Sequence, residues 1–293
     1  YQRMADRFSP EQVQEIDKCV KDAKASGESG EVTALDIVKA WQASEAAPFT
    51  KEELQGMAKT LESLALPLSS RTKWPAPPSS LNETGRGLFF VFEGLDRSGK
   101  STQSKLLTKH FEAEGLNVKW TCFPNRATAM GSVIDLYLRK KLDLSDKVIH
   151  EFFSANRWES ASTLVASLNQ GTTVICDRYA FSGVAYTAAK GLDFEWCKAP
   201  DRGLPAPDAI FYLHVDPKVG QSRANFGDER YENATMQANV RKEFQRPELR
   251  AGVSWHDVDG DRPIDDIHAE IRKAVDAVRA EKGQSAVEPL WMG

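Results

Sequence analysis

Apolar residues recur three and four positions apart in three stretches near the start of the chain, at 9–24, 33–43 and 50–64. This spacing places them on one face of a helix. Thr50 followed by Glu53 matches a capping box, in which each side chain bonds a free backbone N–H at the start of a helix. We therefore predict a small all-helical module over residues 1–64.

The turn "ASGESGEV" between the first two predicted helices is similar to a calcium-binding EF-hand loop, with Gly30 at the glycine position. That register puts Ala25, Gly27 and Ser29 where calcium needs oxygen ligands, and Asp36 where it needs glutamate. The residues therefore favour a plain helical module over a calcium site.

The pattern changes twice after this module. Residues 65–86 are rich in proline and serine and show no periodicity, which predicts a linker. From residue 87 onward, short apolar runs alternate with helical stretches. Such runs indicate strands buried on both faces, and hence a three-layer α/β/α fold with a parallel five-stranded sheet. The predicted strands of this part, 87–293, are 87–94, 117–123, 172–179, 209–216 and 254–260.

Composition narrows the classes of function. The formal net charge of −4 argues against non-specific nucleic-acid binding. The four cysteines form no CxxC pair, which favours reduced thiols. No apolar run reaches the roughly 18 residues of a membrane span, and no signal-peptide pattern opens the chain. We expect a cytoplasmic enzyme, with nuclear or mitochondrial pools left open, and no membrane partner.

Gly94, Gly99, Lys100 and Ser101 match the P-loop pattern G-x-x-x-x-G-K-[ST], between a predicted strand and a predicted helix. The glycines turn backbone N–H groups inward, and the helix N-terminus adds partial positive charge. This predicts ATP or GTP binding, with Ser98 and Thr102 also in the loop. A GTPase switch is disfavoured because no N-K-x-D motif occurs and the one D-x-x-G follows the last strand.

Two further groups of residues belong with this loop. Asp177 ends a predicted strand, as does the carboxylate that supports magnesium beside a P-loop, so we predict Ser101 and Asp177 as the metal ligands. Because ligands bind beyond the carboxyl ends of parallel strands, Arg97, Arg126 and Arg178 are expected to meet there. Segment 223–237, with Arg223 and Arg230, is either a lid over the phosphates or a solvated face.

"FFSANRWE" (152–159) places Phe153 and Arg157 four positions apart on one helix face. A ring beside a planar donor suits a flat heterocycle, one stacking and the other bonding its edge. A core phenylalanine and a surface arginine are the alternative.

These segments together resemble the thymidylate kinase family of the eukaryotic type. The resemblance rests on "EGLDRSGKSTQSKLL", "FSANRWE", "DRYAFSGVAYTAAKG", "GLPAPD" and "FGDERYEN", in this order along the chain. It implies a P-loop nucleoside monophosphate kinase fold, a homodimer, and the reaction ATP + dTMP ⇌ ADP + dTDP with Mg²⁺. Residues 1–86 have no counterpart in the family pattern. A module that binds a protein partner, a targeting module, a dimer accessory and an inert addition all stay open.

The resemblance also implies roles for residues. Phe153 would stack on thymine, Arg157 would bond its edge, and Arg126 and Arg178 would grip the dTMP phosphate. Tyr186 would exclude a 2′-hydroxyl. Other positions that match the dTMP pocket are Phe123, Pro124, Leu138, Asn156, Gly183, Tyr231 and Gln237, while Lys100, Arg223 and Arg230 would contact ATP.

Asp96 is a carboxylate inside an anion-binding loop. By resemblance, it accepts a hydrogen bond from the 3′-hydroxyl of dTMP, and Arg97 beside it is the catalytic arginine. Because the acceptor phosphate is already anionic, no general base is expected. Asn125 departs from the family, whose members often carry an acid there. Another monophosphate or deoxynucleoside kinase, and a non-catalytic nucleotide-binding regulator, remain as alternatives.

Overall fold

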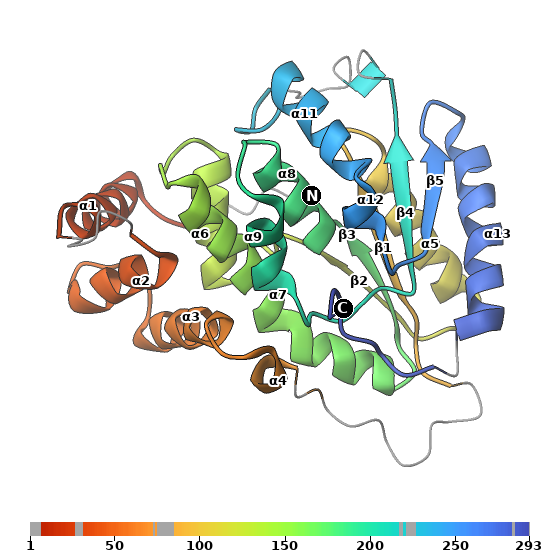
Figure 1. The fold of residues 1–293 in the computed structure, drawn as a ribbon, viewed down its shortest axis with the longest axis horizontal. Helices are drawn as coiled ribbons and strands as arrows, with labels where there is room; N and C mark the ends of the chain where they lie inside the picture. The colour runs from red at the N-terminus through yellow and green to blue at the C-terminus, as the bar shows by residue number, and fades with distance from the viewer. Residues whose placement is uncertain are drawn as a thin grey trace.

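The computed structural model describes residues 7–26, 32–72, 74, 85–216, 219–220, 227–282 and 285–292. A twisted sheet with helices on both faces forms one part of the molecule, and the N-terminal helices lie beside it, against the helices over residues 129–138 and 146–169 (Figure 1). Gly27, Ser29, Gly30 and Arg223, which the sequence singled out, lie outside the described residues, as does half of the predicted linker.

The five predicted strands are confirmed, and all pair in parallel in the order β2-β3-β1-β4-β5. The central strand β1 therefore has a neighbour on each side, and the P-loop leaves the sheet at its middle. The strands are β1 (Phe89–Gly94), β2 (Val118–Cys122), β3 (Thr173–Asp177), β4 (Ala209–His214) and β5 (Trp255–Asp259).

Helical segments connect these strands and cover both faces of the sheet, which confirms the predicted α/β fold (Figure 1). They are α5 (Lys100–Ala113), α6 (Ala129–Leu138), α7 (Asp146–Asn169), α8 (Ala180–Ala188), α9 (Phe194–Lys198), the 3-10 turn η1 (Ala199–Asp201), α11 (Ala234–Phe244), α12 (Pro247–Arg250) and α13 (Ile264–Lys282).

Alternate residues of β1 pack into two different hydrophobic cores, one on each face of the sheet. Phe90 and Phe92 pack with apolar residues of α5 and α13 on one face. Phe89 and Val91 pack with α7, α8 and α11 on the other. Because successive side chains of a strand point to opposite faces, a continuous apolar run is what a strand between two helical layers requires.

The predicted N-terminal helices are present as α1 (Pro10–Ser26), α2 (Ala34–Ala43) and α3 (Lys51–Leu64). The predicted capping box of Thr50 and Glu53 starts α3. A second one starts α2, where the carboxylate of Asp36 accepts from the backbone of Thr33. Asp36, assigned to the last ligand position of the EF-hand register, therefore caps a helix instead.

The linker stretch contains one ordered turn, α4 (Leu68–Arg71). Just beyond it, the ring of Trp74 stacks on Trp158 of α7 at 5.8 Å between centroids. A four-residue helix is too short to show a 3.6-residue periodicity, so the sequence pattern did not reveal it. At the end of the linker, Arg86 forms a buried ion pair with Asp208 at 2.6 Å.

Three global expectations can be compared with the structure. No helix among the described residues is both long and apolar enough to cross a membrane. All four cysteines are free thiols, and three of them are buried. Within the same residues, no three His, Cys, Asp or Glu side chains gather in a way that could hold a metal ion.

Candidate active site

The P-loop connects β1 to α5 and begins and ends at glycines in the left-handed region, with φ of +140° at Gly94 and +99° at Gly99. A Cβ atom at Gly94 would lie 2.2 Å from the carbonyl oxygen of Leu213. Both positions therefore require glycine, one for its backbone angle and one also for space. Helix α5 starts directly after the loop, so its free N–H groups point at any anion bound there.

Lys100 is the first residue of α5 and is buried. Its ammonium group donates hydrogen bonds to the carbonyl of Leu95 and, at 3.2 Å, to the hydroxyl of Ser98. Burial and the nearby Arg178 lower the pKa of Lys100 to about 8. A phosphate group in the loop would supply the negative charge that this ammonium lacks in the free protein.

The carboxylate of Asp96 is held on both oxygens. Arg178 donates to one oxygen, while the hydroxyl of Tyr186 at 2.9 Å and the amide of Gln237 at 2.7 Å donate to the other. Gln237 also accepts from the backbone N–H of Asp96. Burial alone would raise the pKa of Asp96, but Arg178 and Lys100 bring it below its ordinary value. The loop therefore carries a stable negative charge at this point.

Arg97 adopts a left-handed backbone angle, φ +63°, which is uncommon for a residue other than glycine. Its guanidinium pairs with Glu232 at 2.9 Å. The angle turns this side chain away from the strand direction and toward the segment before α11. The P-loop arginine is thus placed at the edge of the site with an acid as its partner.

Ser101 and Asp177 meet beside the loop, as predicted. The Ser101 hydroxyl donates to one carboxylate oxygen of Asp177. The other oxygen, Oδ1, is buried and has no hydrogen-bond partner among the described residues. A hydroxyl and a carboxylate oxygen with free capacity suit Mg²⁺, which takes one or two protein oxygens, phosphate oxygens and water. These two residues fit the predicted metal.

Arg178 follows β3 with φ +64° and reaches back across the sheet edge. It donates to the Gly94 carbonyl and to the Ser182 hydroxyl, each at 3.0 Å, as well as to Asp96. The buried Glu93 accepts from the Ser182 hydroxyl and from the backbone N–H groups of Tyr179 and Ser182. Glu93 therefore fixes the start of α8, and with it the position of Arg178.

Arg126 lies between two acids, Asp135 of α6 at 2.6 Å and Glu229 at 2.7 Å. The loop that bears it is held by Asn156, whose side-chain oxygen accepts from the backbone N–H of Asn125 at 2.7 Å. Gly131 lets the loop lie on α6, because a Cβ there would meet the Asn125 carbonyl oxygen at 1.8 Å. Asn156 thus positions the loop rather than lining the pocket.

Arg157 is buried on α7 and makes a two-point ion pair with Asp201, at 3.1 Å and 2.5 Å. Ser154 donates to the same carboxylate. Opposite the guanidinium lies Gly183, where a Cβ would come within 2.6 Å of Nη2. The surface-arginine alternative is therefore wrong for Arg157, since the side chain is fixed inside the protein.

One pocket brings most of the predicted substrate residues together. It lies between the P-loop, α7, α8 and the segment before α11. The predicted residues that line it are Asp96, Phe123, Pro124, Arg126, Leu138, Phe153, Arg157, Arg178, Gly183, Tyr186 and Tyr231.

One of the residues predicted to contact ATP, Arg230, is engaged elsewhere. Arg230 donates to the carbonyls of Tyr137 and Leu142, at 3.0 and 3.1 Å, and pairs with Asp143, so its guanidinium is engaged at the end of α6. Ser98 and Thr102 stay in the loop and the first turn of α5, as expected. Arg223, which was predicted together with Arg230 to contact ATP, lies outside the described residues.

Sequence reasoning missed five acids that position these arginines: Glu93, Asp135, Asp201, Glu229 and Glu232. A signal existed for Glu93, because a charge within an apolar strand needs buried partners. Glu229 and Glu232 lay in a charge-rich segment that the sequence could not orient. Nothing local marked Asp201, since its partner Arg157 is 44 positions away.

The comparisons with known proteins agree with this geometry. The family model described as thymidylate kinase matches residues 92–271. The thymidylate kinase of Schizosaccharomyces pombe is 47% identical over 194 residues, which are 65% of this chain and 92% of that protein. The human thymidylate kinase is 42% identical over 208 residues, 70% of this chain and 98% of that protein.

A solved structure of thymidylate kinase from Candida albicans superposes with a TM-score of 0.63 at 34% identity, covering 70% of this chain and 98% of that one. Helices α1 to α3 precede the part matched by the family model. The chain belongs to the thymidylate kinase family, and its activity is the phosphorylation of dTMP to dTDP.

Proposed function

We propose that dTMP binds in the pocket lined by Phe153, Arg157 and Tyr186, with its phosphate at Arg126 and Arg178. Support comes from the lining of the pocket, which combines aromatic and aliphatic side chains with the guanidinium groups of Arg126, Arg157 and Arg178. A flat base suits the ring of Phe153, and the buried guanidinium of Arg157 has a planar edge to offer. The forked guanidinium groups of Arg126 and Arg178 match phosphate oxygens.

ATP, which a kinase of this family uses, binds in this proposal with its phosphates in the P-loop against Lys100. Ser101 and Asp177 are the residues that would hold Mg²⁺, and the ion would supply positive charge that offsets the charge on the transferring group. Arg97 lies at the same edge and can stabilise the charge that develops during transfer. The dTMP phosphate attacks as an anion, so the residues need only orient it in line.

The observation that carries the proposal is the position of Asp96. It belongs to the P-loop by sequence and to the acceptor pocket by contact. An anion there repels phosphates but accepts a hydrogen bond from a neutral hydroxyl, such as the 3′-hydroxyl of dTMP. The same contact fixes the distance between the two substrates, because the loop that holds the donor phosphates also holds the acceptor sugar.

Two of the proposed phosphate ligands are paired with acids in the free protein, Arg126 with Glu229 and Arg97 with Glu232. Both acids lie in the segment before α11, for which the sequence leaves a lid and a solvated face open. A phosphate at Arg126 takes the place of the Glu229 carboxylate, because both present oxygens to the same N–H groups. Substrate binding then requires this segment to shift.

The proposal is tested by measuring ATP turnover with magnesium against dTMP, dUMP, UMP, dGMP, dCMP and thymidine. Turnover is expected to be fastest with dTMP. Thymidine should react poorly because it offers no phosphate to the arginines, and UMP should react poorly because its 2′-hydroxyl meets Tyr186. Lys100→Met serves as the inactive control. Turnover of thymidine equal to that of dTMP would instead identify a deoxynucleoside kinase.

The division into residues 1–64, 65–86 and 87–293, the homodimer and an unknown protein partner of the N-terminal helices remain proposals that rest on sequence pattern and family resemblance. Multi-angle light scattering of the full chain measures the mass of the particle directly. A mass of twice the 32.6 kDa chain supports the dimer. The mass of one chain rejects it.

A further inference from the structure

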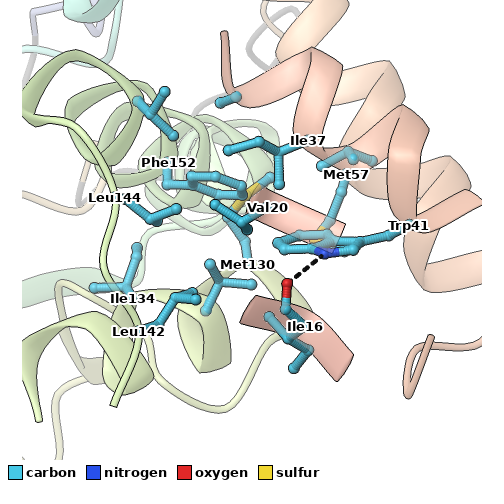
Figure 2. Close-up of a cluster of buried hydrophobic side chains, with 14 of the residues drawn as sticks. Ile16, Val20, Ile37, Trp41, Met57, Met130, Ile134, Leu142, Leu144 and Phe152 are labelled. Carbon is cyan, nitrogen blue, oxygen red and sulfur yellow. Dashed lines mark hydrogen bonds between the residues drawn. The ribbon is translucent and has the colours of Figure 1, made fainter. Parts of the chain in front are cut away.

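The N-terminal helices do not have a hydrophobic core of their own. The buried residues Ile16, Val20, Ile37, Trp41 and Met57 belong to a single cluster with apolar residues of α6 and α7. Figure 2 shows the side chains of both groups facing one another across the same space. The helices that precede the kinase sequence are therefore packed into it as one body.

Trp41 lies at the centre of this cluster. Its side chain is fully buried, its ring centroid lies 6.1 Å from that of Phe152 of α7, and its indole N–H donates to the Ile16 carbonyl at 3.5 Å (Figure 2). A buried tryptophan contributes a large apolar area and one directional bond, so it sets the spacing of the helices around it. Here that spacing is between α1, α2 and α7.

Neighbouring residues of α7 contact the N-terminal helices and the acceptor pocket. Phe152 faces Trp41, while the next residue, Phe153, lines the acceptor pocket, and Arg157 follows one turn later. Phe153 and Tyr231, two lining residues of the pocket, also pack against the cluster that contains Trp41. Close packing is therefore continuous from the N-terminal helices to the walls of the pocket.

Helix α6 repeats this arrangement. Leu138 belongs to the cluster and lines the pocket, and Asp135 on the same helix holds Arg126. Polar contacts add to the apolar ones. The first backbone N–H of α2, at Ala34, donates to Glu151 of α7 at 2.8 Å. A carboxylate at a helix N-terminus is a favourable partner, which fixes the end of α2 on α7.

The donor side of the site has separate support. Within the described residues, the two clusters that flank the sheet and carry β1, α5 and the P-loop contain no residue of α1, α2 or α3. The N-terminal helices thus contact the helices that bear acceptor residues and do not take part in the core under the P-loop.

We propose that the N-terminal helices are a positioning element of the acceptor site, in which Trp41, packed on Phe152, sets the position of Phe153 and Arg157 for dTMP. Trp41 is a positioning residue, because it does not line the pocket itself and acts through its contact with Phe152. The inference rests on the proposed binding of dTMP in this pocket. A positioning role predicts that changes at Trp41 alter the binding of dTMP and leave the binding of ATP unchanged, because a tightly packed interior transmits a displacement only to the groups that it contacts.

The first experiment compares Trp41→Ala with Trp41→Phe in the full chain, with Ile271→Ala as the matched control. Ile271 is fully buried on α13, away from the N-terminal helices. All variants are assayed below their melting temperatures. We expect Trp41→Ala to raise the KM for dTMP about tenfold with the KM for ATP unchanged, and Trp41→Phe to restore most of it. Ile271→Ala should lower Tm without raising the KM for dTMP.

Equal effects of Trp41→Ala on both substrates, or no effect in a folded variant, would overturn the inference. If the unmodified enzyme does not turn over dTMP at all, the proposed function fails instead, so the two failures are distinct.

A second experiment needs no variant and covers the case in which Trp41→Ala does not fold. Hydrogen exchange of the unmodified full chain is followed at α2 and α3 with dTMP and, separately, with a non-hydrolysable ATP analogue. Coupling between sites is reciprocal, so dTMP should slow exchange at helices that it does not touch. The ATP analogue alone should not. Unchanged exchange at α2 and α3 with saturating dTMP would contradict a positioning role.

Discussion

At the scale of single residues, the half-buried carboxylate of Asp96 and the buried ammonium of Lys100 are opposite charges in one loop. Each is stabilised by neighbours supplied from elsewhere in the chain. Arg178, Tyr186 and Gln237 surround Asp96, and they come from the ends of β3, α8 and α11. A buried charge costs several kcal/mol unless such partners are present. The charged residues of the loop are therefore stable only because distant segments of the chain supply their hydrogen-bond and ion-pair partners.

Asp96→Asn is expected to lower kcat/KM for dTMP roughly 10- to 100-fold, since a hydrogen bond to a charged group contributes about 1.5–3 kcal/mol. The amide is the same size, but its NH₂ group faces the N–H groups of Arg178 or Gln237. ATP affinity, measured by calorimetry without dTMP, should fall little. Glu232→Gln, which changes an acid of the same site outside the P-loop, is the control and should lose less.

The pKa of Lys100, lowered to about 8, predicts a pH dependence of ATP binding in the absence of dTMP. Phosphate binding needs the ammonium form. As pH rises through 8 that form is lost, so affinity should fall about tenfold between pH 7 and pH 9. Calorimetric titration at several pH values measures the slope. A flat profile over this range would show that the ammonium is not deprotonated there.

The same scale shows where sequence reasoning stops. Lys100, Ser101 and Asp177 were found because motif spacing and a strand end place them together. Asp201 and Glu229 could not be found, since the arginines that they hold are far away in the chain. Motifs reveal groups that act on a ligand through local geometry. They do not reveal the acids that orient those groups through the tertiary fold.

At the scale of elements, α7 and α8 approach each other so closely that only glycine fits between them at one point. Gly183 of α8 faces the guanidinium of Arg157, which Asp201 holds from the other side. The guanidinium of Arg157 cannot move away from a methyl group at position 183 without straining its hydrogen bonds to Asp201. The close packing of α7 and α8 therefore also determines the position of Arg157, the group proposed to bind the base.

Gly183→Ala is expected to weaken dTMP binding about tenfold, because forcing a methyl group into a filled site costs about 1–3 kcal/mol. The KM for ATP should be unchanged. Gly56→Ala is the matched control: Gly56 lies within α3 with nothing near its Cβ position. That change should stabilise the protein by about 0.5–1 kcal/mol and leave both KM values alone. Thermal unfolding and steady-state kinetics distinguish the two.

Elements were the most predictable level of this protein. All five strands were expected, but the expected burial on both faces is wrong for the edge strands β2 and β5, which are largely half-exposed. The helices α1, α2 and α3 were expected from helical spacing, because burial on one face leaves a periodic trace. The four-residue helix α4 is too short to leave a periodic pattern in the sequence. The partner of the N-terminal apolar faces could not be predicted either. An amphipathic pattern says that a face is buried and does not say against what, so the shared core with α6 and α7 appears only in the structure.

At the scale of the whole molecule, the kinase part begins at a buried ion pair. Arg86 and Asp208 are 5% and 6% exposed and lie at the point where the chain enters the sheet. Asp208 also accepts from the backbone N–H of Phe89. The pair therefore joins the end of the linker, the first strand and the turn before β4. Removing one member leaves the other charge buried and unpaired.

Arg86→Met is expected to lower the free energy of unfolding by about 3–5 kcal/mol, the usual cost of breaking a buried pair. The control is Arg279→Met. The pair of Arg279 with Glu114 is 37% and 42% exposed, so that change should cost less than about 1 kcal/mol. Urea unfolding followed by circular dichroism compares them. Similar midpoints for the two variants would mean that the buried pair is not structural.

The contacts of Arg86 have a further consequence for how such a chain can be rearranged. Its guanidinium also binds the carbonyl of Ser285, and Pro205 forms a bridge with Pro289, so residues near 86 and near 285 lie side by side. When the two ends of a folded unit are neighbours, a gene can be fused at that seam or the ends can be joined and reopened elsewhere. An extra helical segment joined there leaves the connections between the strands as they are.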